Sequence, residues 1–214
     1  MIRGGMNLAV PLAGKRLDWR SAATAKLRPL AGDEGAPLTS IALLADRQAL
    51  HVRFTCRATR INARMRNDGD PLYLEDVVEV FLWPGGDPAV YLEYEVSPLG
   101  RGLCLLCCQR DGRTSRWRPW GTAAADAPSC TVTVQGGPQQ PLAAIRSWNA
   151  ELRIPFAALN GVAASPAPGT QWRVNCYRID HDDGTPRHLA WAPPPMIDFH
   201  HLDSFGTITF TGRP

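Results

Sequence analysis

The stretch YLEDVVEVFLWPGGDPAVYLEYEVSPLG, residues 73–100, carries most of the information about the fold. Apolar and polar residues alternate with a period of two on both sides of the WPGGDP turn, which is typical of two β-strands with one buried face. If Phe81 pairs with Glu93 across the turn, the antiparallel register also places Glu79 opposite Glu95, with Cβ atoms roughly 5 Å apart. Two facing carboxylates repel one another unless an arginine, a cation or a ligand rich in hydroxyl groups lies between them. A solvated sheet face has the same pattern, so both interpretations stay open.

The rest of the chain continues this pattern. Short alternating or apolar runs predict strands at 50–56, 102–109, 130–135, 147–155, 171–180 and 205–212, and long loops at 57–73, 110–129 and 181–204. The first 40 residues look partly irregular, and no segment shows helical periodicity over three turns. Together with 38 glycines and prolines, this predicts a single domain over residues 1–214, an all-β antiparallel sandwich of immunoglobulin-like or jelly-roll-like type with little helix.

Composition excludes several classes of protein. The formal net charge is only +3 and the arginines do not cluster, so we expect no nucleic-acid partner. No apolar run is long enough for a signal peptide core or a membrane span, so we expect no membrane association. The chain as it stands is therefore expected in the cytoplasm, although a periplasmic or secreted protein whose leader has been removed would look the same.

Six cysteines are present, and four lie at apolar positions of predicted strands, where small buried side chains are expected. Cys104 and Cys107 form a CxxC motif, but no second pair or histidine partner has zinc-finger spacing. The motif alone therefore predicts no metal site.

Two loops are rich in acidic residues, and calcium prefers six to eight oxygen ligands of this kind. Neither loop has the spacing of an EF-hand, and solvated turns can have the same composition. We nevertheless take five aspartates as candidate ligands for a structural calcium ion: Asp68, Asp70, Asp76, Asp182 and Asp183.

No catalytic motif is recognisable: the chain lacks GxSxG, a P-loop, HExxH and a GxGxxG after a strand.

Tryptophans in predicted loops, among them Trp191, offer flat π faces on which a sugar ring could stack. They could equally fill the ends of a sandwich. We therefore expect a binding protein rather than an enzyme.

The segments EDVVEVFL, YLEYEVSPLG, WRVNCYRID and LAW…DFHHLDSFGTITF, from about residue 40 to the end, resemble carbohydrate-binding module family 9-like (DOMON-like) domains. The resemblance implies a β-sandwich, often with structural calcium, that grips the reducing end of a sugar between two aromatic residues. Matched to this pattern, the aromatic positions are Tyr73 and Phe199, and Glu79 is a polar contact. Glu95 and Ser97 stand where the family's sugar-binding members have Arg and Asn, which reverses the charge and removes a donor.

The expected function is thus a non-catalytic module that binds a carbohydrate or related polyol, and the expected ligand site is Tyr73, Glu79, Glu95, Ser97, Trp191 and Phe199. Two alternatives from other classes remain. One is a b-type haem electron-transfer domain on a related sandwich, with ligands drawn from Met65, Met196, His188, His200 and His201. The other is a carbohydrate-active hydrolase or an isomerase that uses Glu79, Glu95 and His200.

Overall fold

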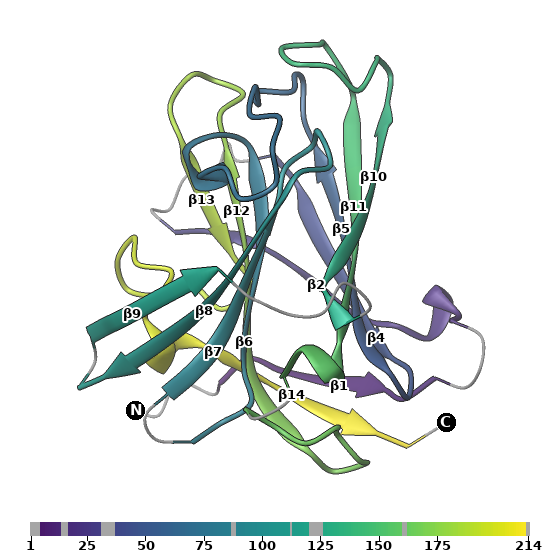
Figure 1. The fold of residues 1–214 in the computed structure, drawn as a ribbon. Coiled ribbons are helices and arrows are strands. Elements are labelled where there is room, and N and C mark those ends of the chain that lie inside the picture. Colours follow the sequence, from purple (N-terminus) through teal and green to yellow (C-terminus); the bar gives the residue numbers. More distant parts are fainter. Residues whose placement is uncertain are drawn as a thin grey trace.

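The structure is a computed structural model that describes residues 5–13, 17–30, 37–86, 89–111, 113–119, 126–159 and 162–212. The described strands form two sheets that face each other (Figure 1). Helical structure in these residues is limited to single 3-10 turns of three or four residues. The chain is therefore an all-β sandwich, as the sequence predicts.

The larger sheet has the strand order β1-β14-β12-β6-β7-β8-β9, and β13 and β3 extend it beside β12. Its strands are β1 (Asn7–Pro11), β3 (Arg28–Pro29), β6 (Val77–Trp83), β7 (Ala89–Val96), β8 (Gly102–Arg110), β9 (Arg113–Pro119), β12 (Gln171–Asp180), β13 (Arg187–Ala190) and β14 (Gly206–Thr211). The smaller sheet has the order β10-β11-β5-β4-β2. Its strands are β2 (Ala23–Lys26), β4 (Thr39–Ala45), β5 (Ala49–Arg57), β10 (Ser129–Gln135) and β11 (Ser147–Pro155).

Four short helical turns complete the described secondary structure. They are η1 (Trp19–Ser21), η2 (Leu72–Leu74), η4 (Phe156–Leu159) and η5 (Leu202–Ser204). None of the helices in the described ranges has the length and apolar character needed to cross a membrane.

The main core lies between the sheets. Val78, Val80 and Leu82 of β6 point into it, as the alternation predicts, and meet side chains of the smaller sheet such as Phe54 and Trp148. A second apolar cluster lies on the opposite, outer face of the larger sheet. It joins outward side chains of the sheet to loop residues, and it includes Leu72, Phe81, Tyr91, Tyr177, Ala190, Leu202 and Phe205.

The structure corrects four details of the predicted topology. Three strands, β1, β2 and β3, lie within the first 40 residues, where mostly irregular structure was expected. β9 and β13 lie within segments predicted as loops. The sandwich is not wholly antiparallel, because β1 pairs with β14 in parallel. Strands of two to five residues, such as β1, β2, β3 and β13, are too short for a readable period-two pattern.

Candidate functional site

The hairpin of β6 and β7 has the predicted register, with Glu79 opposite Glu95 and Phe81 opposite Glu93. Alternation then places these four side chains on the outer face of the larger sheet. The face is not open to solvent, however: Glu79 is 2% exposed, Glu95 0% and Glu93 6%. The expectation of an exposed carboxylate-bearing face is therefore wrong, because the second apolar cluster covers this part of the sheet.

A cavity of about 760 Å³ opens on this face. Its volume lies in the usual range for small-molecule sites. Three aromatic residues line it, Tyr73, Phe81 and Phe199, together with the acidic and imidazole side chains of Asp68, Glu79, Glu93, His188 and His200. The lining thus comes from several elements: η2 and the loop before it, the β6–β7 hairpin, β8, β12, β13 and the loop that follows β13.

The two aromatic residues expected to contact a ligand, Tyr73 and Phe199, both line this cavity. Tyr73 lies in η2 and is 48% exposed. One face of Phe199 stacks on Tyr177, with ring centroids 4.0 Å apart and an interplanar angle of 9°. The hydroxyl of Tyr177 also donates a hydrogen bond to the Phe199 carbonyl oxygen at 3.0 Å. Phe199 is therefore held in place from one side.

The facing carboxyl groups of Glu79 and Glu95 make few compensating contacts. Among the described residues, Oε1 of Glu79 and both carboxyl oxygens of Glu95 have no hydrogen-bond partner. Burial raises the pKa of Glu79 well above its usual value, and the nearby charge of Glu93 adds to the effect. Burial, then the charges of Glu79 and Glu93, raise the pKa of Glu95 to about 11. Burial thus favours the protonated form of both groups, and a protonated carboxyl group can both donate and accept a hydrogen bond.

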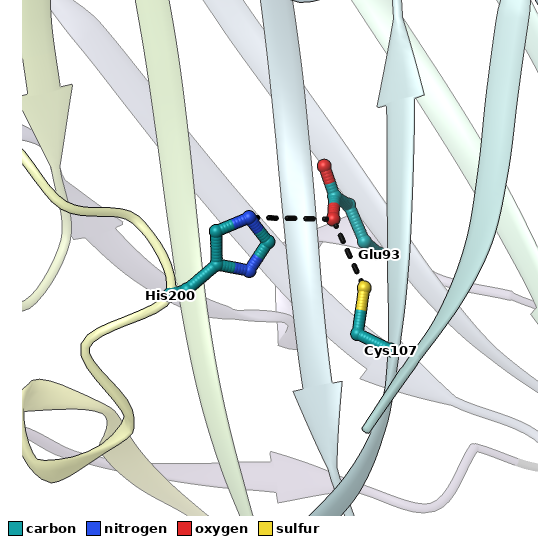
Figure 2. A group of neighbouring side chains, drawn as sticks. All are labelled: Glu93, Cys107 and His200. Carbon is teal, nitrogen blue, oxygen red and sulfur yellow. Dashed lines mark hydrogen bonds and ion pairs between the residues drawn. The ribbon is translucent and has the colours of Figure 1, made fainter. Parts of the chain in front are cut away.

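Another cluster of side chains on this face consists of Glu93, Cys107 and His200 (Figure 2). The thiol of Cys107 donates a hydrogen bond to Oε2 of Glu93 at 3.3 Å. Nε2 of His200 lies 4.0 Å from the same oxygen. On its other side, the His200 ring makes a 2.7 Å hydrogen bond through Nδ1 to the Tyr91 hydroxyl.

Three of the predicted ligand residues, Glu95, Ser97 and Trp191, do not line the cavity. Trp191 is 1% exposed and belongs to the main core, so its expected place in an exposed loop is wrong. It follows β13 directly, and its backbone N–H donates to the Cys176 carbonyl, which draws the ring inward. Ser97 lies just after β7 and is also buried, with its hydroxyl oxygen accepting from the Arg101 backbone N–H.

The five aspartates predicted to bind calcium each accept hydrogen bonds from other groups of the protein. Asp76 accepts hydrogen bonds from the backbone N–H groups of Asn62 and His181. Asp182 accepts two hydrogen bonds, from the backbone N–H groups of Thr59 and Arg60. The other three bind Gly102 N–H (Asp68), Asn67 N–H (Asp70) and the Arg187 guanidinium (Asp183).

These aspartates therefore do not converge on one point. Within the described residues, the one set of three His, Cys, Asp or Glu side chains whose ligand atoms lie within 4.8 Å of one another is Glu93, Cys107 and His200. The geometry gives no support to a calcium ion held by the five aspartates, and calcium binding stays a prediction.

The residues considered for haem binding are scattered. His188 and His200 line the cavity. Met196 is 62% exposed, and His201 hydrogen-bonds to Ser204. Met65 packs against the second apolar cluster. No methionine from this set lines the cavity.

Sequence reasoning did not assign Glu93 or Cys107 to the site. Glu93 could have been found from the sequence of residues 73–100, because it is two residues before Glu95 and its side chain therefore points to the same face of the strand. Cys107 is diagonal to Glu93 on β8, since Glu93 pairs with Leu105, so it needed the β7–β8 register. His200 lies 93 residues after Cys107 and 107 residues after Glu93, in the loop that follows β13. No local sequence pattern predicts that it lies beside them.

Comparison with known proteins places the chain in a family. The family model described as carbohydrate-binding family 9 matches residues 36–210. A curated relative from Arthroderma benhamiae, named an extracellular protein, is 24% identical over 181 residues, which are 81% of this chain and 79% of the relative.

Three solved structures share the fold. A proposed carbohydrate-binding protein from Bacteroides uniformis has a TM-score of 0.78 and 20% identity, covering 96% of this chain and 99% of the other. Two structures of a family 9 carbohydrate-binding module from Caldicellulosiruptor kristjanssonii, each 15% identical, have bound sugars. The complex with cellotriose has a TM-score of 0.66 (97% and 95% coverage), and the complex with glucose 0.67 (97% of both chains). With the family model matching most of its length, this chain belongs to carbohydrate-binding family 9.

Proposed function

We propose that this protein is a non-catalytic module that binds a sugar or a related polyol in the cavity on the outer face of the larger sheet. The observation that carries the proposal is the lining of this cavity, in which aromatic rings stand beside the buried carboxyl group of Glu79, whose Oε1 has no hydrogen-bond partner among the described residues. Membership of carbohydrate-binding family 9 supports the ligand class.

The aromatic and the polar lining residues suit the two kinds of group on a sugar ring, its C–H groups and its hydroxyl groups. The C–H groups of a pyranose ring can pack on the exposed ring of Tyr73 and on the part of Phe199 that Tyr177 does not cover. The hydroxyl groups can exchange hydrogen bonds with Glu79, which has an unpartnered oxygen, and with the cavity histidines. Since polar groups buried without partners are costly, a ligand that satisfies them gains affinity.

Glu95 and Ser97 stand where the resemblance places the arginine and asparagine of sugar-binding members, so the contacts of those members with a sugar do not transfer directly to this chain. Both residues are buried, and neither lines the cavity. We therefore propose that a reducing-end grip of the family's usual kind is replaced by contacts from Glu79, His188 and His200. The sugar preference is then expected to differ from that of modules with an arginine in the site.

Isothermal titration with glucose, cellobiose and cellotriose, in the presence of a chelator, tests the proposal. We expect at least one of these sugars to bind, and Tyr73→Ala to weaken its binding by about tenfold or more through lost stacking, at roughly 1–3 kcal/mol. Trp19→Ala is a matched aromatic control, because Trp19 contacts Arg53 on the smaller sheet. The proposal is wrong if none of the three sugars binds, or if Tyr73→Ala binds as tightly as the parent.

We also propose that the protein acts outside the cytoplasm. The relative from Arthroderma benhamiae is named an extracellular protein, which supports export. None of the six cysteines is in a disulfide bond, so folding itself needs no oxidising compartment. Fractionation of cells that produce the protein from its natural gene, with an antibody against it, distinguishes the two locations.

A further inference from the structure

The cluster of Glu93, Cys107 and His200 offers one oxygen, one sulfur and one nitrogen ligand on a single side of the larger sheet (Figure 2). Glu93 and Cys107 are fixed by neighbouring strands, β7 and β8, at diagonal positions of the ladder. His200 approaches from the loop after β13, and its side chain is 38% exposed. Two rigid ligands and one adjustable ligand therefore meet beside the cavity.

We propose that Glu93, Cys107 and His200 bind a zinc ion, whose fourth position is open to the cavity. Zinc is the divalent ion that accepts thiolate, imidazole and carboxylate ligands together, and sites with three protein ligands keep a fourth position for water or another ligand. Glu93 and His200 both line the cavity, so that fourth ligand would come from there. Binding replaces the proton on the Cys107 sulfur with the metal, and the proton leaves to solvent.

One of the observed ligand–ligand distances already fits a tetrahedral site, and the two that involve His200 are bounded by 4.8 Å. With zinc–ligand bonds of about 2.0–2.3 Å, the edges of a tetrahedron are roughly 3.3–3.6 Å long. The edge from Cys107 Sγ to Glu93 Oε2 is 3.3 Å, and that from His200 Nε2 to the same oxygen is 4.0 Å. All three ligand atoms lie within 4.8 Å of one another. A small shift of the partly exposed His200 would close the site.

A second contact orients the imidazole for this role. The Tyr91 hydroxyl hydrogen-bonds to His200 Nδ1 at 2.7 Å and lies 3.3 Å from the Thr114 hydroxyl. If Tyr91 donates to Thr114, it accepts the proton on His200 Nδ1, and the lone pair on Nε2 then points toward Glu93. Histidines that bind metals commonly donate their second ring N–H in this way.

The lack of a lysine or arginine partner for Glu93 also favours a cation. Glu93 is buried on the outer face of the larger sheet. Among the described residues, no lysine or arginine forms an ion pair with it, and its contact to a basic group is that with His200. A divalent ion bound to Glu93 would give this buried carboxyl group a charged partner.

The CxxC motif does not take part as a pair. Positions 104 and 107 are three residues apart on β8, so alternation sends their side chains to opposite faces. Cys107 joins the second apolar cluster on the outer face, whereas Cys104 packs against the main core. The proposed site therefore uses one cysteine with ligands from two other segments.

Metal titration of tag-free, metal-free protein in the absence of sugar tests the proposal. We expect one Zn²⁺ per chain in competition with a chromophoric chelator, and Co²⁺ in its place to give a thiolate-to-metal charge-transfer band. Cys107→Ala should abolish the band, and Glu93→Gln and His200→Gln should weaken zinc binding by about tenfold or more. Cys176→Ala, which removes another buried thiol, and His201→Gln, at the next residue, should bind as the parent does.

The proposal is overturned if the parent binds no stoichiometric metal, or if Cys107→Ala keeps the charge-transfer band. If Cys107→Ala fails to fold, His200→Gln decides, because its side chain is partly exposed; unchanged zinc affinity in that variant would also overturn the site. Sugar binding is measured with chelator present. A protein that binds sugar and no zinc refutes the metal site alone, and one that binds zinc and no sugar refutes the proposed function alone.

Discussion

Three carboxyl groups, those of Glu79, Glu93 and Glu95, share one buried face of the larger sheet, and this defines the chemistry of the site. Each would cost free energy if it were charged and unpaired there. Glu93 has partners in the Cys107 thiol and, at longer range, His200. For Glu79 and Glu95, burial raises the pKa, which favours their uncharged, protonated forms.

The pKa shift of Glu79 predicts how stability depends on pH. The unfolded chain loses this proton near pH 4.5, whereas the folded protein keeps it to a much higher pH. Because the folded state binds more protons above pH 4.5, the free energy of unfolding falls as pH rises, by up to about 1.4 kcal/mol per pH unit for one group. Glu79→Gln has no such proton to lose, so its stability should fall less between pH 5 and 8.

Urea unfolding at pH 5, 6.5 and 8, with chelator present, checks this expectation. Glu151→Gln is a suitable control, because Glu151 is on the smaller sheet and its side chain is 47% exposed. Equal pH slopes for Glu79→Gln and the parent would contradict the assigned pKa shift.

At the scale of the element, the start of the last strand depends on a glycine. Gly206 is the first residue of β14, and Phe205 directly precedes it. Gly206 lies against the ring of the buried Trp191: a Cβ atom there would be 2.5 Å from Trp191 Cζ3 and 2.9 Å from the Met6 carbonyl oxygen. The absence of a side chain lets Trp191 enter the core instead of the cavity.

Gly206→Ala should therefore destabilise the fold, because a large ring and a backbone carbonyl must both move. Overpacking of this kind typically costs about 1–3 kcal/mol. Thermal or urea unfolding measures the change, with Gly5→Ala as the control, since a Cβ at that exposed glycine meets nothing within 4 Å. Gly206→Ala with the parent's stability would show that Trp191 is not packed as described.

At the scale of the whole molecule, a buried ion pair links the two sheets. Arg178 and Asp180 of β12 pair within the sandwich, and both side chains are fully buried. The guanidinium also donates to Thr39 Oγ1 at 2.9 Å and to the Arg57 carbonyl oxygen at 2.8 Å. These acceptors belong to β4 and β5, so one arginine of the larger sheet satisfies polar groups of the smaller sheet.

Arg178→Met should destabilise the protein strongly, because it leaves Asp180 and two acceptors buried without their donor. Breaking a buried pair in this way costs about 3–5 kcal/mol. Arg53→Met removes a partly exposed ion pair with Glu151 and should cost about 1 kcal/mol or less. Urea unfolding of both variants measures the difference, and similar losses for the two would refute the role given to Arg178.

The sequence alone predicted the sandwich class, most of the strands and, on the condition that Phe81 pairs with Glu93, the pairing of Glu79 with Glu95. These features follow from period-two alternation and a short turn, which involve residues within the 73–100 stretch or within single strands. The same pattern, read through the family resemblance, also selected Tyr73, Glu79 and Phe199, which line the cavity.

Only the tertiary structure decided that the carboxylate face is buried, that Trp191 lies in the core and that His200 meets Glu93 and Cys107. His200 reaches Tyr91 across 109 positions of the chain, and Asp182 reaches Thr59 across 123. A strand's alternation shows which residues share a face, but it does not show which distant loop will cover that face. That outcome depends on how the loops pack once both sheets have formed, because burial and pKa are properties of the surroundings of a residue and not of its neighbours in sequence.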